Sequence, residues 1–210
     1  MSWINSEVDL GFTKLSSTDG LHICLIYNNE EERREIVQNF AQSGFNSFEK
    51  VAYFADQENP LDPKEWLEQY NVQIKDELKP GQFTLSSAFD TYTPHGVFEP
   101  DEMLSKLEAI YHSAKDEGFH GCRGSGEMSW ALNELPGSER LLEYESRINN
   151  ILVEHPLVVM CQYDASKFSG STILGVLKVH PYMLVKGMVV QNPYYETPDV
   201  FLGKNNDSIL

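Results

Sequence analysis

Basic residues are scarce in this chain. It has 16 Lys+Arg against 32 Asp+Glu, which gives a formal net charge of -16. Such a charge repels phosphate backbones and anionic lipid surfaces, and no basic run offsets it locally. There is also no apolar stretch long enough to span a bilayer and no secretion signal at the N-terminus. We therefore expect a cytoplasmic protein that does not bind nucleic acid directly and does not contact a membrane.

Cysteine is also scarce in this chain. The three cysteines, Cys24, Cys122 and Cys161, are an odd number spaced far apart, which argues against a disulfide framework and fits reduced thiols. The metal-binding spacings C-x-x-C, H-E-x-x-H and H-x-H are missing, so we expect no metal and no other cofactor. One alternative stays open, a spatial cluster of the three cysteines with His22 and His180. Buried cysteines that act as small apolar residues explain the pattern as well.

The sequence also lacks a P-loop, the motif whose glycines and lysine bind phosphate. The turn at 27–32, YNNEEE, has neither residue type, whereas a P-loop needs both at a helix N-terminus. Its three carboxylates would repel a triphosphate. The glycines of 121–126 have the wrong intervals for G-x-G-x-x-G, and no G-x-S-x-G elbow is present. We therefore expect a protein that is not an enzyme, with a cysteine- or metal-dependent enzyme as the alternative.

Apolar runs and amphipathic segments do alternate along the chain. Expected strands lie at 22–27, 49–55, 82–87 and 157–163, and expected helices at 30–43, 102–117, 138–154 and 171–179. This order predicts a three-layer α/β/α fold with a mostly parallel sheet, and residues 182–190 predict an antiparallel hairpin at its edge. We expect one domain at 21–202, a loosely attached arm at 1–20 and a flexible tail at 203–210.

The stretch 121–132, GCRGSGEMSWAL, is the densest in groups that can contact a ligand. We interpret it as a strand-to-helix turn, where ligands of open α/β sheets collect. Glu145 lies in the apolar stripe of its helix, so it needs a donor such as Arg123. The predicted pocket has seven lining residues: Tyr27, Arg123, Glu127, Trp130, Glu145, Tyr163 and His180. The alternative is that Arg123, Glu127 and Glu145 only tie helices to the sheet.

An ordered set of motifs resembles one known family. The motifs are HICLIY (22–27), NFAQSG (39–44), EKVAY (49–53), CRGSGEMSW (122–130), LEYE (142–145), CQY (161–163), HP (180–181) and NPYY (192–195). From about residue 20 to about residue 202 the chain resembles the MEDS family, the methanogen/methylotroph sensory domains of the DcmR-like type. The match covers nearly the full chain, and the ordered set of motifs is much more specific than any one of them.

The resemblance implies a sensory domain of prokaryotic signal transduction that binds a small molecule. Its proposed ligands are simple hydrocarbon derivatives, such as methylated or halogenated one-carbon compounds. Such domains occur alone or fused to histidine kinases or DNA-binding regulators, and we expect output through a partner of that kind or through a homodimer. The layout also resembles a KaiC/RecA-type ATPase core with a degenerate P-loop. A relic that still binds nucleotide is therefore the other alternative.

Overall fold

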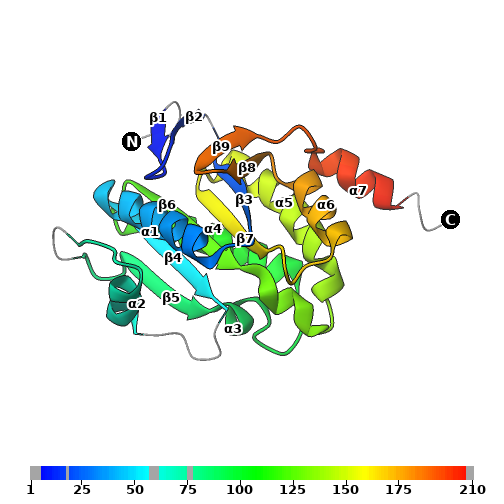
Figure 1. Ribbon diagram of the computed structural model, residues 1–210, viewed down its shortest axis with the longest axis horizontal. Helices are drawn as coiled ribbons and strands as arrows, with labels where there is room; N and C mark the ends of the chain where they lie inside the picture. The colour runs from blue at the N-terminus through cyan, green and yellow to red at the C-terminus, as the bar shows by residue number, and fades with distance from the viewer. Residues whose placement is uncertain (1–5, 18, 57–61, 75–77, 207–210) are drawn as a thin grey trace.

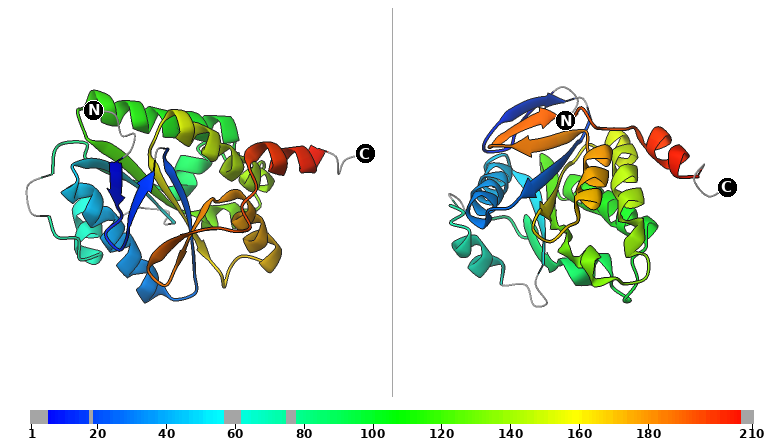
Figure 2. Two further views of the ribbon diagram at one scale, coloured as in Figure 1. Left: turned by 90° about the horizontal axis from the view of Figure 1, so that it is seen from above. Right: turned by 45° about the vertical axis from the view of Figure 1, so that its right-hand side comes forward.

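A seven-stranded sheet lies between two layers of helices (Figures 1 and 2). The computed structural model describes residues 6–17, 19–56, 62–74 and 78–206. The strand order is β5-β4-β6-β7-β3-β8-β9, and only the β8–β9 pair is antiparallel. The strands are β3 (Leu21–Tyr27), β4 (Glu49–Ala55), β5 (Phe83–Ser87), β6 (Gly121–Glu127), β7 (Val158–Asp164), β8 (Tyr182–Val185) and β9 (Met188–Gln191). The predicted fold class and edge hairpin are confirmed.

Each face of the sheet has its own hydrophobic core. Helices α1 (Glu30–Asn46) and α2 (Pro63–Gln69) cover one face. The other face is covered by α3 (Ala88–Tyr92), α4 (Pro100–Asp116), the 3-10 helices η1 (Met128–Asn133) and η2 (Ser138–Arg140), α5 (Leu141–Glu154) and α6 (Gly170–Val179), with α7 (Pro198–Asn206) outside α5 and α6. Central strands are buried on both faces, which explains their continuous apolar runs. Successive residues point into opposite cores, as Ile23 and Cys24 do.

The N-terminal segment is attached more firmly than the sequence suggested. Strands β1 (Ser6–Asp9) and β2 (Lys14–Ser17) form a separate antiparallel hairpin. Leu10 is fully buried, and the Asp9 carbonyl oxygen accepts a hydrogen bond from Ser43 Oγ at 2.6 Å. The expectation of a loose arm is therefore wrong for residues 6–17, while residues 1–5 lie outside the described ranges. In the expected tail, residues up to Asn206 belong to α7 and residues 207–210 are likewise outside.

The glycine-rich stretch 121–127 is a buried strand, not a turn. The turn comes only where β6 ends at Glu127. Gly126 is needed for close packing, since a Cβ atom there would lie 2.5 Å from Tyr92 Oη. The Tyr92 ring in turn stacks on Trp130 at 4.7 Å between centroids. Glycine therefore serves the contact between β6 and α3 rather than a loop.

Candidate functional site

The carboxyl ends of β3 and β7 form a switch point in the topology. After Tyr27 the chain crosses to α1 on one face, and after Asp164 it crosses to α6 on the other. The Ala165 N–H donates to the Tyr27 carbonyl oxygen at 2.7 Å, which ties the two exits together. Ligands of open α/β sheets bind outside such strand ends. A ligand site is therefore expected at this edge of the sheet.

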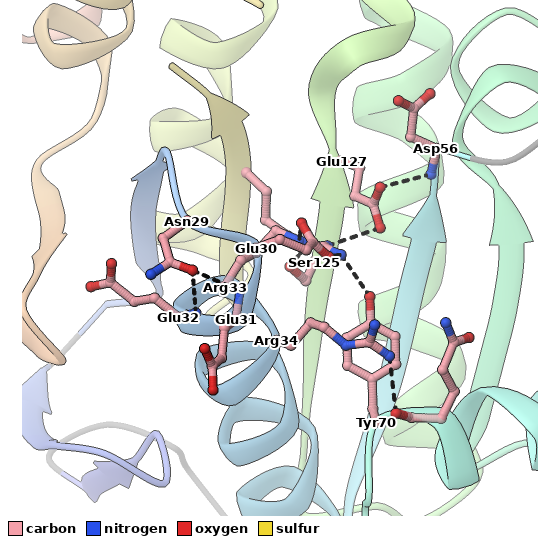
Figure 3. Close-up of polar contacts among 12 residues, drawn as sticks. Asn29, Glu30, Glu31, Glu32, Arg33, Arg34, Asp56, Tyr70, Ser125 and Glu127 are labelled. Carbon is pink, nitrogen blue, oxygen red and sulfur yellow. Dashed lines mark hydrogen bonds and ion pairs between the residues drawn. The ribbon is translucent and has the colours of Figure 1, made fainter. Parts of the chain in front are cut away.

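The helix N-terminus at this edge is already capped. Asn29 Oδ1 accepts from the backbone N–H groups of Glu31 at 2.9 Å and Glu32 at 3.4 Å. These are amides that a helix N-terminus offers to a phosphate group. Glu30, Glu31 and Glu32 also place three carboxylates in the first turn (Figure 3), where they complement the helix dipole themselves.

Arg33 fills the space between this helix and the strand ends (Figure 3). All three of its nitrogens make hydrogen bonds. Nε donates to Glu30 and Nη2 to Glu30 and Tyr70. Nη1 donates to three oxygens, those of Tyr53 (3.0 Å), Glu127 (3.2 Å) and Gln162 (3.0 Å). The side chain is buried, so the cation is held by internal partners.

Two of the predicted site residues belong to this Arg33 network. Glu127 accepts from Arg33, from Tyr53 Oη at 2.6 Å and from the Asp56 N–H at 3.2 Å. Burial, with Glu127 beside it, raises the pKa of Tyr53 well above its ordinary value, so the phenol is a proton donor here. The Arg33 guanidinium lies 5.5 Å from the centre of the Tyr27 ring.

Arg123 lies apart from this network, although it is on the same face of the sheet. It is fully buried, and its Nε donates to Glu49 at 2.5 Å. Its Nη1 and Nη2 donate to the carbonyl oxygens of Phe40 (2.9 Å) and Asp9 (3.1 Å). Arg123 thus joins β6, β4, α1 and the N-terminal hairpin of β1 and β2. The predicted Arg123–Glu145 pair is wrong, because the two side chains lie on opposite faces of the sheet.

A second polar cluster is buried on the opposite face. We call it the His–Glu–Cys cluster; its members are His22 (β3), Glu145 (α5), Cys161 (β7) and His180 (after α6). Their ligand atoms, one from each side chain, lie within 4.8 Å of one another. Glu145 Oε2 lies 3.0 Å from His22 Nε2, 3.3 Å from His180 Nε2 and 3.4 Å from Cys161 Sγ. Tyr163 Oη donates to the other carboxylate oxygen at 2.8 Å.

The electrostatics of this cluster follow from its burial. Burial and the neighbouring His180 lower the pKa of His22 to about 4. Burial alone would raise the pKa of the Glu145 carboxyl, but the two imidazoles that face it hold this pKa well below its ordinary value. Burial and Glu145 raise the pKa of the Cys161 thiol well above its ordinary value. The cluster thus places a carboxylate beside two imidazoles and a thiol that keeps its proton.

The seven predicted residues therefore do not line one pocket. Tyr27 and Glu127 meet at Arg33, and Glu145, Tyr163 and His180 meet in the His–Glu–Cys cluster. Arg123 is separate, and Trp130 is fully buried between Tyr92 and Phe98. Of the metal alternative, His22, Cys161 and His180 do come together, with Glu145 in addition; Cys24 and Cys122 are not among these ligands.

Sequence reasoning missed Arg33 and Gln162. Arg33 lies among the buried residues of α1, where an arginine needs several buried acceptors. Gln162 breaks the apolar run of β7, and its amide bonds Arg33 at one end and Ser125 Oγ at the other, at 2.8 Å. A polar residue that interrupts a central strand was the available signal.

An apolar groove lies at the same edge of the sheet, between η1, η2, α5 and α6. Its volume is about 740 Å³. The apolar lining residues are Ala131, Leu132, Leu135, Pro136, Leu141, Leu142 and Phe168, and the polar ones are Glu134, Ser138, Glu139, Ser171 and Thr172. This volume and lining are typical of small-molecule sites. No helix within the described ranges has the length and apolar character needed to cross a membrane.

Comparison with known proteins adds the family and the fold relatives. The chain is 28% identical over 160 residues to the transcriptional repressor DcmR of Methylorubrum extorquens, and the match covers 76% of this chain and 57% of DcmR. The chain thus spans little more than half of that relative.

Solved structures with a similar fold include KaiC-like proteins. A KaiC-like protein from Pyrococcus horikoshii has a TM-score of 0.51 at 13% identity, covering 79% of this chain and 70% of that one. The flagellar accessory protein FlaH from Methanocaldococcus jannaschii has a TM-score of 0.52 at 14% identity, covering 81% and 76%. An uncharacterized Pyrococcus horikoshii protein, crystallised with an unknown peptide, has a TM-score of 0.56 at 15% identity and 82% coverage of both chains.

The sequence model of the methanogen/methylotroph, DcmR sensory domain matches residues 21–181. That range includes strands β3 to β7 and ends just before the edge hairpin of β8 and β9, and it includes both polar clusters. The chain belongs to the MEDS family of sensory domains.

Proposed function

We propose that this chain is a non-catalytic sensory domain that binds a small, largely apolar molecule instead of a nucleotide. The observation that carries the proposal is the Arg33 network. At the strand-to-helix junction where a nucleotide-binding relative would hold phosphate, the buried cation has all its nitrogens engaged and the helix amides are capped by Asn29. A triphosphate would have to displace these bonds and approach three carboxylates.

The apolar groove is the proposed ligand site. It is formed at the carboxyl edge by residues that follow β6 and β7, where ligands of this fold class bind. Its apolar lining suits a hydrocarbon derivative, and Ser138, Ser171 and Thr172 offer hydroxyl groups to a polar end. The resemblance to the family implies methylated or halogenated one-carbon compounds as ligands. A groove of this volume would hold several such molecules, or one together with water.

Output passes to a signalling partner. The relative DcmR is a transcriptional repressor, so a transcription regulator is the favoured partner, and a histidine kinase or a second copy of this chain are the alternatives. The chain's own charge disfavours direct DNA contact. Its three cysteines are buried and unpaired, which fits a reducing cytoplasm.

A thermal-shift screen tests the ligand proposal. The compounds are short alcohols, methylamines and halomethanes on one side and nucleotides with magnesium on the other. We expect stabilisation by members of the first group only, because a ligand that binds the folded state raises its stability. The variant Leu132→Glu places a charge in the groove and should abolish the shift. Val153→Glu, an exposed apolar position outside the groove, should keep it. Stabilisation by nucleotides alone would overturn the proposal.

A further inference from the structure

The His–Glu–Cys cluster has an unusual arrangement of hydrogens. His180 Nδ1 lies 2.8 Å from the Val176 carbonyl oxygen, which can only accept, so Nδ1 carries the hydrogen. In a neutral imidazole with its hydrogen on Nδ1, Nε2 carries a lone pair and no hydrogen. It is buried, it makes no hydrogen bond to any described residue, and it lies 3.3 Å from Glu145 Oε2. A lone pair therefore faces a carboxylate.

His22 has the same arrangement, fixed by Asn149. The Asn149 Nδ2 group donates to the carbonyl oxygens of Ser146 (3.0 Å) and Val179 (2.8 Å), so its Oδ1 is the atom that faces His22. His22 Nδ1, at 3.2 Å, must donate to this oxygen. In the neutral ring, its Nε2 then carries a lone pair and lies 3.0 Å from Glu145 Oε2 and 3.7 Å from Cys161 Sγ.

A proton can resolve only part of this conflict. Protonation of one imidazole would pair it with Glu145. The ring centroids of His22 and His180 are 4.0 Å apart, however, and like charges at that distance oppose protonation of both rings. A metal ion among the four ligand atoms would engage both lone pairs at once. Histidine ligands commonly donate their other ring N–H to an oxygen acceptor, as both do here.

Four of the six spacings between the ligand atoms are close to those around a tetrahedral ion. With ordinary zinc bond lengths, two nitrogen or oxygen ligands lie about 3.3 Å apart, and a sulfur lies about 3.6 Å from either. The two nitrogen–oxygen distances in the cluster are 3.0 and 3.3 Å, and two of its three sulfur distances are 3.4 and 3.7 Å. The remaining two pairs, which both involve His180 Nε2, lie within 4.8 Å. Tyr163 holds the second oxygen of Glu145, which leaves Oε2 for the ion.

We infer that His22, Glu145, Cys161 and His180 form a four-coordinate site for one divalent transition metal, with zinc the best fit to the donor set. The ion binds two imidazole nitrogens, one carboxylate oxygen and one thiolate, and the Cys161 thiol proton is released to solvent. One dication with a carboxylate and a thiolate makes the site neutral, which suits a fully buried position. Such a site ties β3 and β7 to α5 and to the end of α6, independently of the ligand groove.

Metal content and titration test this inference. The full chain is purified, freed of metal with a strong chelator and titrated with zinc chloride while thermal unfolding is followed. We expect one zinc per chain, and a rise of at least about 5 °C in the midpoint of unfolding at zinc concentrations well above the dissociation constant. Substitution by cobalt should give an intense near-ultraviolet thiolate charge-transfer band, a signature that a purely structural cluster cannot produce.

Two variants locate the site. Cys161→Ala should remove the cobalt charge-transfer band and weaken zinc binding at least tenfold, whereas Cys122→Ala, at another buried free thiol, should retain both. His180→Ala should also weaken zinc binding. A metal-free protein that takes up no zinc or cobalt would overturn the inference. So would binding that is unchanged in Cys161→Ala and His180→Ala, because the ion would then lie elsewhere.

Discussion

The substitution Arg123→Met separates a structural role of this arginine from the ligand-contacting role that its sequence context suggested. Methionine retains an apolar stem over the Phe40 ring, whose centre lies 5.0 Å from the guanidinium carbon. It leaves the carbonyl oxygens of Phe40 and Asp9 without their donor and Glu49 without its cation. We expect a loss of about 3 kcal/mol in the free energy of unfolding, the lower end for a broken buried pair, because the Glu49 side chain is 16% exposed.

A loss of this size is easily measured. For a chain of this length, 1 kcal/mol shifts the midpoint of thermal unfolding by about 2–4 °C, so the midpoint should fall by roughly 6–12 °C. Urea unfolding followed by circular dichroism gives the free energy directly, with an unchanged dependence on denaturant. In a double-mutant cycle, Glu49→Gln should cost less in the Arg123→Met background than alone, because the pair is already broken.

Arg140→Met is the matched control. Arg140 is also paired with carboxylates, but its side chain is 37% exposed, so its loss should cost less than about 1 kcal/mol. If Arg123→Met costs no more than Arg140→Met, the buried network around Arg123 does not stabilise the fold as described. A ligand-contacting arginine would behave in that way in the free protein.

Two further predictions concern the elements that flank the site. Asn29→Ala removes the cap of α1 and should destabilise the protein by about 1 kcal/mol, as measured by urea unfolding. Asn29→Asp retains an acceptor and should cost less. Equal losses in the two variants would contradict the capping role. Gly126→Ala forces a Cβ atom against Tyr92 and should lower the free energy of unfolding by about 1–3 kcal/mol. Gly124→Ala in the same strand should cost less, because the nearest atom to its Cβ would be the Ala52 carbonyl oxygen at 4.0 Å. The reverse order would contradict the packing of β6 on α3.

The fold could be predicted from the sequence because local signals and the buried sheet agree. The continuous apolar run of β7 and the helical spacing of α4 each identify one element type, and both elements lie where expected. The strand β6 was misread as a turn because three glycines usually mark one. Here Gly126 permits close contact with α3, and that contact depends on Tyr92, which lies about 30 residues earlier in the chain.

The candidate site was predictable only in part. The apolar stripe showed that Glu145 points inward and needs partners, but it could not show which partners. His22 and His180 reach Glu145 through the order of the strands in the sheet, which no local pattern encodes. Arg123 and Glu145 looked complementary in charge, yet strand alternation places them on opposite faces. Side-chain direction, rather than residue type, therefore separated the seven predicted residues.

The Arg33 network and the Asn29 cap together close the position that a phosphate group would take at the start of α1. Titration calorimetry with ATP and magnesium, together with a crystal soaked in the same solution, tests it most directly. We expect no saturable heat up to millimolar ATP and an intact contact between Arg33 and Glu127. Saturable binding, with a triphosphate seated against Asn29 and the first turn of α1, would contradict it.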